Sequence, residues 1–301
     1  MEKPDNSIHL WRSFLFIPAH VNKFVAKAAQ SGADVVVLDL EDGVPPISKT
    51  VAREAVLASA ATLSSAGAEV AVRINLETEL ARLDVNACVG ENVSIIIIPK
   101  VETSEQVCRV ADQIDDRQVS LGLNNDHTVL IALIETPLGL LNAVEIAHSH
   151  PRLHGLNLGT EDFSFEMGME PEWDALLYPS QQVAIVAKAA GIVALGYAGS
   201  IAQFRDIDAF EKTVKKSSRL GFEGGFAIHP AQVPALNRVF SPSQEAIEQA
   251  EKVVTAFEGL ENSGIGAVKV DGKMVDLPIA NRARQILDRA KYIANREQKQ
   301  L

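Results

Sequence analysis

Acidic and basic residues follow several short apolar runs of this sequence, either at once or within a few residues. Glu135 ends the run at 129–134, Asp162 follows the run at 156–158, and Arg73 follows a third run. Buried charges are costly unless they are paired, so packing alone would not gather acids and cations at so many run ends. The pattern predicts a functional site.

The two carboxylates indicate a hard metal ion. Mg²⁺ takes one or two protein carboxylates and keeps several water or substrate oxygens as its remaining ligands. Glu135 and Asp162 belong to successive strand–helix units, so we expect their side chains to share one ion. Arg73 would then bind a substrate carboxylate through two parallel hydrogen bonds.

A second acidic group follows another run, in the order Asp39-Leu40-Glu41-Asp42. We expect Asp39, Glu41 and Asp42 to hold water molecules of the metal ion from across the site. Lys100 stands at a further run end, and we expect it to be a structural partner of these acids.

Structural alternatives exist for each acid. Glu135 would be a structural acid if it paired with Arg73 or Lys100. Asp162 would be a helix cap if Glu161 were the metal ligand instead.

Asp42 has two structural alternatives, a helix cap or an ion pair with Lys49 or Arg53. His229, which precedes Pro230, has no carboxylate beside it in the sequence. We therefore expect His229 to pack or to form hydrogen bonds rather than to catalyse.

Eight short apolar runs, each followed by a longer amphipathic segment, must position these residues. Alternation of strands and helices predicts parallel pairing, and eight repeats favour a closed (β/α)8 TIM barrel. An open doubly wound sheet is the alternative, although no GxGxxG follows the first run. The expected strands are 14–17, 35–38, 70–72, 95–98, 129–134, 156–158, 192–195 and 226–228. The clearest expected helices are 49–65, 104–114, 138–148, 181–190 and 206–220. A barrel brings all the run ends to one rim.

The last 61 residues follow a different pattern, so we expect a catalytic barrel over 1–240 and a C-terminal extension over 241–301. The extension should contain a helix to about residue 257, a flexible connection at 259–266 and a last helix over 279–294. Asp271-Gly272 between two apolar stretches predicts a type I′ hairpin. Helix, hairpin and helix together would form a hinged lid.

Composition excludes several classes of partner. The formal net charge of −11 argues against binding to nucleic acid or to an anionic membrane surface. The longest apolar run has about six residues, far short of the ~20 needed to span a membrane. The chain has two cysteines, and its first eleven residues do not resemble a signal peptide, so we expect a cytoplasmic protein.

Several motifs, in this order along the chain, resemble one family. They are Arg12-Ser13-Phe14-Leu15-Phe16-Ile17-Pro18-Ala19, Asp39-Leu40-Glu41-Asp42-Gly43-Val44, Val72-Arg73-Ile74-Asn75, Ile98-Pro99-Lys100, Ile134-Glu135-Thr136 and Ile228-His229-Pro230-Ala231-Gln232. The sequence is similar to citrate lyase β-subunit-like proteins of the HpcH/HpaI aldolase and malyl-CoA lyase superfamily. The resemblance implies a TIM barrel, Mg²⁺ as cofactor and reversible cleavage of a 3-hydroxyacyl-CoA thioester. The products would be an acetyl-CoA-type thioester and a 2-oxo acid.

The resemblance also assigns residues. It implies that Glu135 and Asp162 bind the metal, that Arg73 binds the substrate carboxylate, and that Arg12 and Lys23 contact CoA phosphates. It further implies that Asp276 is a catalytic aspartate on the lid of a neighbouring subunit, and hence a homo-oligomer, a trimer or hexamer. The structural alternative for Asp276 is a cap of the last helix.

One stretch departs from the family pattern. Relatives often carry an aspartate after the seventh strand, where this chain reads Tyr197-Ala198-Gly199-Ser200. The alternative functions are the β subunit of a citrate lyase complex acting on a carrier-bound thioester, a malyl-CoA thioesterase, a CoA-free class II aldolase and an inactive barrel scaffold.

Overall fold

The computed structural model describes residues 11–202, 204–259 and 266–299. The chain divides into two compact units, Met1–Val239 and Phe240–Leu301. Two expectations concern residues outside the described ranges. They are the nature of the first ten residues and most of the flexible connection at 259–266.

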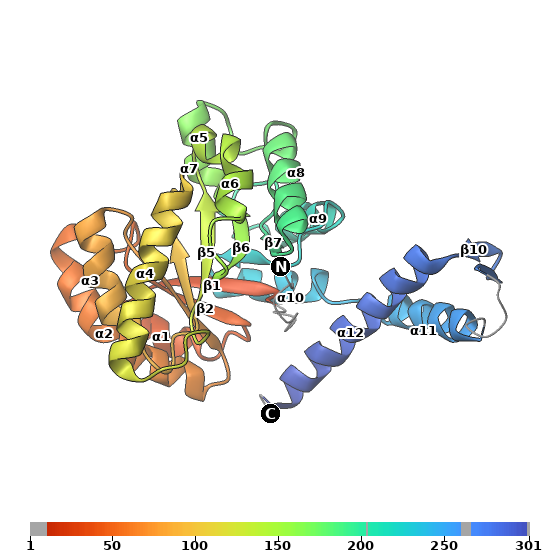
Figure 1. The fold of residues 1–301 in the computed structure, drawn as a ribbon, viewed down its shortest axis with the longest axis horizontal. Helices are drawn as coiled ribbons and strands as arrows, with labels where there is room; N and C mark the ends of the chain where they lie inside the picture. The colour runs from red at the N-terminus through yellow and green to blue at the C-terminus, as the bar shows by residue number, and fades with distance from the viewer. Residues whose placement is uncertain (1–10, 203, 260–265, 300–301) are drawn as a thin grey trace. The chain divides into compact units, whose positions relative to one another are not determined.

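Eight parallel strands form the sheet of the first unit (Figure 1). They are β1 (Ser13–Pro18), β2 (Val35–Asp39), β3 (Glu69–Arg73), β4 (Ile95–Ile98), β5 (Val129–Ile134), β6 (Leu153–Leu158), β7 (Val193–Leu195) and β8 (Gly225–Ala227). The sheet order is β7-β6-β5-β4-β3-β2-β1-β8. A parallel bridge between Leu195 and Gly224 brings β7 and β8 together. The expected TIM barrel is confirmed, and the open-sheet alternative is wrong because this bridge joins the two edges of the sheet.

The barrel is filled by apolar side chains from its own strands. Strands β2, β4 and β5 are buried along their whole length, as expected of strands covered on both faces. Inside, Phe14 of β1 stacks on Phe226 of β8 with ring centroids 4.7 Å apart. This packed interior leaves room for a site only at an end of the barrel.

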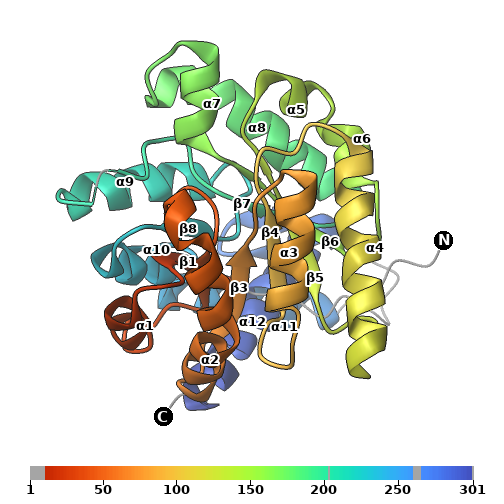
Figure 2. The ribbon, with the colours of Figure 1, turned by 90° about the vertical axis from the view of Figure 1, so that its left-hand side faces the viewer.

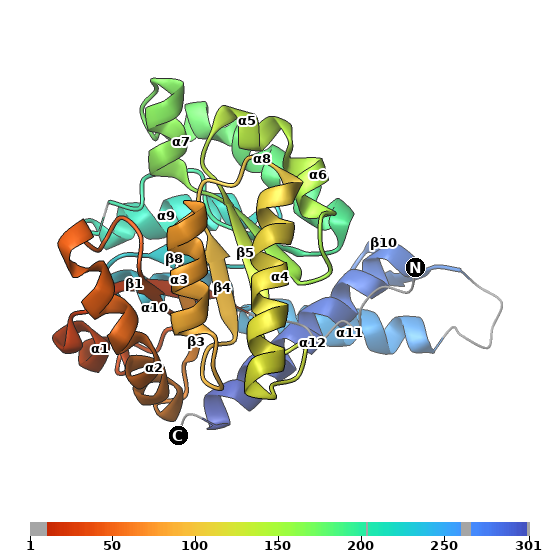
Figure 3. The ribbon, with the colours of Figure 1, turned by 60° about the vertical axis from the view of Figure 1, so that its left-hand side comes forward.

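Helices cover the outside of the barrel (Figures 2 and 3). They are α1 (Asn22–Ala28), α2 (Lys49–Ser65), α3 (Thr78–Cys88), α4 (Ser104–Leu121), α5 (Pro137–Leu141), α6 (Ala143–Ala147), α7 (Thr160–Met167), α8 (Trp173–Ala190), α9 (Ile207–Ser218) and α10 (Val233–Val239), with short 3-10 turns η1 (Pro46–Ser48) and η2 (Pro230–Gln232). The expected bounds of α2 are confirmed, whereas α4 runs seven residues beyond the expected end. The expected helix 138–148 is split into α5 and α6, because Asn142 has φ −91° and ψ 4°, outside the helical range.

The second unit contains two helices and a hairpin. Helices α11 (Gln244–Glu258) and α12 (Leu277–Lys299) pack together, and β9 (Val268–Val270) pairs antiparallel with β10 (Lys273–Val275) (Figure 1). Asp271 and Gly272 both have positive φ, at 46° and 81°, as a type I′ turn requires. No helix among the described residues is long and apolar enough to cross a membrane.

Candidate active site

A pocket of about 390 Å³ opens at the carboxyl ends of the barrel strands. Its walls include Arg73 at the end of β3, Glu135 after β5, and Asp162 in the first turn of α7. The structure therefore brings together the three residues that the sequence singled out first. Parallel strands end on one rim of a barrel, which is why residues so distant in sequence meet here.

Glu135 is buried in this pocket, with 3% of its surface exposed. Its Oε2 accepts a 2.7 Å hydrogen bond from the backbone N–H of Lys100. Gly159 passes so close that a Cβ atom there would lie 2.4 Å from Cγ of Glu135. The glycine is therefore needed to make space for the carboxylate.

Asp162 lines the same pocket and interacts electrostatically with Glu135. Burial and the negative charge of Asp162 together raise the pKa of Glu135 to about 7. Helix α7 begins after Gly159 without a side-chain cap, so Asp162 is not a helix cap. Glu161, the alternative ligand, instead accepts a 2.5 Å hydrogen bond from the hydroxyl of Ser200.

Arg73 is held by two acids from the β2 end. Its Nε and Nη2 donate to the two carboxylate oxygens of Asp39 at 2.8 and 2.7 Å, and Nη1 lies 2.9 Å from Oε2 of Glu41. Burial alone would lower the pKa of Arg73, but Asp39 and Glu41 outweigh burial and raise it. The guanidinium also lies over the ring of Phe16, 4.8 Å from its centroid. Its position and charge are therefore fixed before any ligand arrives.

Lys100 binds the other acids of the same loop. Its ammonium lies 2.6 Å from Glu41 and 2.9 Å from Asp42, as its expected role as a partner of the acids requires. The ion pairs of Arg73 and Lys100 thus go to Asp39, Glu41 and Asp42 rather than to Glu135. These three acids were expected to hold metal-bound water, but their carboxylates are engaged by protein cations.

Lys49 and Arg53 of α2 were the two expected ion-pair partners of Asp42, but neither binds Asp42. Lys49 donates to the carbonyl oxygens of Leu40 and Glu41 and to Oδ1 of Asn75, at 2.6, 2.6 and 2.8 Å. Arg53 pairs with Asp84 at 2.6 Å. The Asp42 alternatives involving Lys49 or Arg53 are therefore wrong.

Asp84 links these two cations through Asn75. It accepts from the backbone N–H and the side-chain amide of Asn75, at 2.8 and 2.6 Å, and it is fully buried. The network from Arg53 through Asp84 and Asn75 to Lys49 fixes the backbone of the loop that carries Glu41. Sequence reasoning missed this network, and the only signal for it was an acid at a buried position of α3.

Arg12 and Lys23, which were expected to contact CoA phosphates, lie at opposite ends of the barrel. Arg12 precedes β1, at the opposite end of the strands from the pocket, and its buried guanidinium contacts Asp34 twice at 2.9 Å. The structure does not bring Arg12 to the site, because a residue before a strand lies at the amino end of the barrel. Lys23 is exposed in the first turn of α1, which follows the carboxyl end of β1.

Asp276 lies in the second unit and is exposed. Its Oδ1 accepts a 3.2 Å hydrogen bond from the N–H of Ile279, so Asp276 caps α12, as its structural alternative predicts.

His229 caps η2 by accepting a hydrogen bond from the N–H of Ala231, and its ring stacks on Phe204 with centroids 5.1 Å apart. The structural role expected of His229 is confirmed.

The pocket also contains residues that the sequence analysis did not assign. Asn157 lies within β6, 6% exposed, and its signal was a lone amide in an apolar strand. Tyr197, in the stretch that departs from the family pattern, donates its hydroxyl to the carbonyl oxygen of Phe226 at 2.9 Å. In that same stretch, Ser200 is the residue that holds Glu161.

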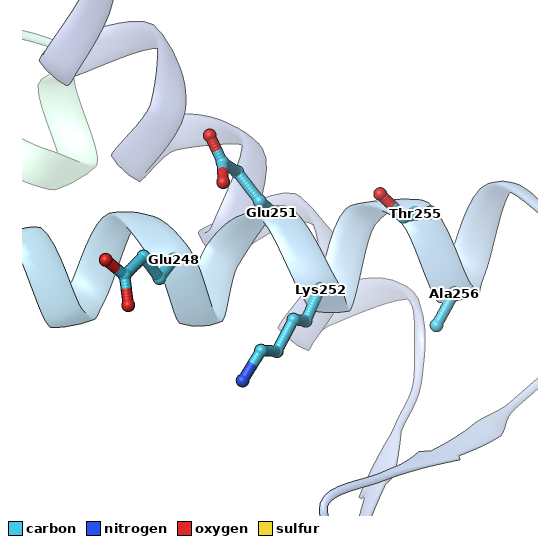
Figure 4. Close-up of a pocket in the computed structure, with 5 residues that line it drawn as sticks. All are labelled: Glu248, Glu251, Lys252, Thr255 and Ala256. Carbon is cyan, nitrogen blue, oxygen red and sulfur yellow. The ribbon is translucent and has the colours of Figure 1, made fainter.

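A second concavity lies in the C-terminal unit. Figure 4 shows its residues, Glu248, Glu251, Lys252, Thr255 and Ala256, all on α11. All except Ala256 are exposed, and none of them is a buried group aimed at a ligand. This shallow surface offers none of the chemistry found in the barrel pocket.

The barrel pocket suits an ion that takes few protein ligands. Among the described residues, no group of three or more His, Cys, Asp or Glu side chains forms a complete metal cage. Two carboxylates with open positions are nevertheless what Mg²⁺ uses when substrate oxygens and water complete its shell. The pKa of Glu135 is raised by burial and by the nearby Asp162, and a bound cation would favour the deprotonated form of Glu135.

Comparison with known proteins agrees with this geometry. A model of the HpcH/HpaI aldolase/citrate lyase family matches residues 12–230. The chain belongs to this family. The predicted resemblance is therefore confirmed, and with it the assignment to a family of lyases.

Two curated members of the family illustrate its range. The citrate lyase subunit beta of Leuconostoc mesenteroides subsp. cremoris is 33% identical over 285 residues, which cover 94% of each chain. A (3S)-malyl-CoA thioesterase of Cereibacter sphaeroides is 37% identical over 289 residues, covering 95% of this chain and 96% of that protein.

Solved structures of the family carry ligands. CitE of Mycobacterium tuberculosis, in complex with magnesium, acetoacetate and coenzyme A, has a TM-score of 0.73 and 29% identity, covering 94% of this chain and 99% of that chain. A citrate lyase beta subunit of Mycobacterium tuberculosis complexed with oxaloacetate and magnesium has a TM-score of 0.63 and 27% identity, covering 79% and 100%.

Proposed function

We propose that this protein is a Mg²⁺-dependent carbon–carbon lyase acting on a 3-hydroxyacyl-CoA thioester. Cleavage would give an acetyl-CoA-type thioester and a 2-oxo acid, and condensation would be the reverse. The observation that carries the proposal is the pair Glu135 and Asp162, which line one pocket with Arg73 at the carboxyl end of the barrel and interact electrostatically. The magnesium, acetoacetate and coenzyme A bound to the CitE relative support the same chemistry.

Glu135 and Asp162 would hold the Mg²⁺ ion. When bound, the ion would polarise the oxygens of the 2-oxo acid and stabilise negative charge on them. Glu135 is fixed by the N–H of Lys100 at one carboxylate oxygen, which leaves its other oxygen for the metal. Asp162 approaches from α7, the helix after the next strand.

Arg73 would bind the carboxylate of the 2-oxo acid. Three of its N–H groups are used by Asp39 and Glu41, and a guanidinium has five. The remaining two can donate to a substrate. Because its side chain is already held in place, little conformational entropy is lost when the substrate binds.

Asp276 would exchange the proton of the acetyl methyl group. It would act as general base in condensation and as general acid in cleavage. Its Oδ1 caps α12, and its second oxygen would carry the proton. We propose that the C-terminal unit acts as a lid on a neighbouring subunit, so that the working protein is a homo-oligomer, a trimer or hexamer.

A second outcome at the same site is hydrolysis of the thioester. If Asp276 activates a water molecule instead of the methyl group, free CoA is released. The 37% identity to a (3S)-malyl-CoA thioesterase favours including this reaction. Action as the β subunit of a larger citrate lyase complex is the other alternative, because the Leuconostoc relative is named as a subunit.

We also propose that the enzyme is cytoplasmic. Its two cysteines, Cys88 and Cys108, are both free, as is usual for proteins of a reducing compartment.

The test uses the purified full-length protein with malyl-CoA, citramalyl-CoA and citryl-CoA, with Mg²⁺ and with a chelator. A lyase releases a 2-oxo acid without free thiol, whereas a thioesterase releases free thiol without a 2-oxo acid.

Two variants test the residue roles. Glu135→Ala should lower kcat by about 100-fold or more. Asp276→Asn should lower kcat by about 100-fold, the scale of general acid–base catalysis, while Mg²⁺ binding is retained. Absence of both products for every thioester would refute the stand-alone enzyme.

A further inference from the structure

The barrel pocket has a charged side and an apolar side. The charged side is formed by Asp39, Asp42, Arg73, Glu135, Glu161 and Asp162. The apolar side is formed by Phe16, Leu133, Ile201, Phe226 and Ile228. A small 2-oxo acid that presents its carboxylate and oxo group to the charged side would turn its third carbon and any substituent away from that side.

The charged side is strongly negative. Five carboxylates stand there, and Arg73 is the only cation among the described residues that line the pocket. Arg73 already pairs with Asp39 and Glu41, and the nearby Lys100 pairs with Glu41 and Asp42. Even with a divalent cation bound, more carboxylate than cationic charge surrounds the ligand. One carboxylate on the ligand can be met by the two remaining N–H groups of Arg73 and by the metal, and a second one would meet repulsion.

The apolar side offers no compensation to a second carboxylate. Phe16 stacks on Phe226 with centroids 5.3 Å apart, and Ile201 packs against the same barrel core as Leu133 and Phe226. A carboxylate placed against this surface would lose its hydration without gaining a partner. The hydroxyl of Tyr197 is turned inward to the carbonyl oxygen of Phe226, and Asn157 adds only a neutral amide.

We propose that the pocket selects a 2-oxo acid with a single carboxylate, whose third carbon carries hydrogen or a short alkyl group, over a 2-oxo acid with two carboxylates. The inference rests on the proposed lyase function and specifies how many carboxylates its 2-oxo acid carries. Oxaloacetate, the dicarboxylate bound to one relative, is the natural competitor.

The test compares ligands that differ in charge and in size. Binding of pyruvate, 2-oxobutyrate, 4-methyl-2-oxopentanoate and fresh oxaloacetate is measured by calorimetry on the full-length protein with Mg²⁺. The last two acids are similar in shape and differ mainly in the terminal carboxylate. We expect pyruvate and 2-oxobutyrate to bind at least about 10-fold more tightly than oxaloacetate, the scale expected for an uncompensated like charge. Oxaloacetate should also bind more weakly than 4-methyl-2-oxopentanoate.

A variant assigns the preference to charge. Ile228 is 43% exposed at the pocket wall, so a lysine there can be accommodated without burying its ammonium. Ile228→Lys should raise the affinity for oxaloacetate relative to pyruvate by about 10-fold. Ile228→Met, which has similar length and no charge, should leave the ratio unchanged. Thermal unfolding of both variants checks that they fold.

The outcomes separate this inference from the proposed function. Equal or tighter binding of oxaloacetate, or an unchanged ratio in a folded Ile228→Lys protein, would overturn the inference alone. Absence of binding by every acid, together with absence of thioester cleavage, would overturn the proposed function and the inference with it.

Discussion

The backbone N–H of Lys100 donates a 2.7 Å hydrogen bond to Glu135, and the side chain of Lys100 reaches the loop that holds Arg73. Lys100 makes both contacts from a left-handed backbone conformation, with φ +50°. Such a conformation costs a residue with a Cβ atom about 1–2 kcal/mol. The strain is therefore located at the residue that positions the proposed metal ligand.

Two substitutions separate the backbone of Lys100 from its ammonium. Lys100→Ala and Lys100→Gly both remove the contacts to Glu41 and Asp42, but only glycine adopts positive φ freely. We expect the free energy of unfolding, measured by urea titration, to be up to about 1 kcal/mol higher for Lys100→Gly than for Lys100→Ala. Mg²⁺ affinity should not fall in either variant, because both keep the backbone N–H that holds Glu135 and both lose a positive charge that repels the ion. Lower stability of the glycine variant would show that the left-handed conformation is not strained.

The raised pKa of Glu135 predicts how stability changes with pH. This pKa lies at about 7 in the folded protein against a usual value of 4.5, so the folded state retains a proton that the unfolded state loses. For this group, stability of the metal-free protein therefore falls as pH rises from 4.5 through about 7. Mg²⁺ requires the deprotonated acid, so the increase in Tm on adding Mg²⁺ should be larger at pH 8 than at pH 6.

Glu135→Gln supplies the control for the pH prediction. The amide has similar shape and does not titrate, so the difference between pH 6 and pH 8 in the Mg²⁺-induced Tm shift should disappear. The same pH dependence in wild type and variant would assign the titration to another group.

Gly159 tests the close approach to Glu135. A Cβ atom in Gly159→Ala would lie 2.4 Å from Cγ and 2.5 Å from Oε1 of Glu135, and the carboxylate would have to move. We expect Mg²⁺ affinity, measured by calorimetry, to fall by about 10-fold to 100-fold. Gly259→Ala is the matched control, because its Cβ atom would meet only carbonyl oxygens at 3.6 and 3.8 Å. Unchanged metal affinity in Gly159→Ala would show that Glu135 does not bind the ion.

The central residues of the site could be predicted because strand ends are readable in a sequence. Glu135, Asp162 and Arg73 each follow an apolar run, and a parallel barrel brings such residues to one rim whatever their separation. By the same rule, Arg12 does not belong to this rim. It precedes the first strand, so it lies at the other end of the barrel, where it pairs with Asp34.

The pairing of charges within the site could not be predicted in the same way. Asp39 and Glu41 were expected to face a metal ion, but their carboxylates hold Arg73. Which acid meets which cation depends on side-chain direction, and that direction is set by contacts distant in sequence. Lys49 was considered as a partner of Asp42, but its ammonium is drawn to two backbone carbonyls and to Asn75.

Asp84 offers a test of action at a distance on the site. It is fully buried in α3 and accepts hydrogen bonds from Arg53 and from Asn75, which in turn binds Lys49. Asp84→Asn leaves Arg53 without its anion, which should lower the free energy of unfolding by about 3 kcal/mol.

The kinetic effect of Asp84→Asn is the more informative one. Asp84 does not line the pocket, but Asn75 binds Lys49, which holds the carbonyl of Glu41, and the carboxylate of Glu41 contacts Arg73. We therefore expect KM for the 2-oxo acid in condensation to rise by about 10-fold, since the guanidinium loses its fixed position. Glu79→Gln removes an exposed ion pair with Arg82 on the same helix and should change neither stability nor KM. A destabilised Asp84→Asn protein with normal KM at a temperature where it is folded would confine the network to a role in stability.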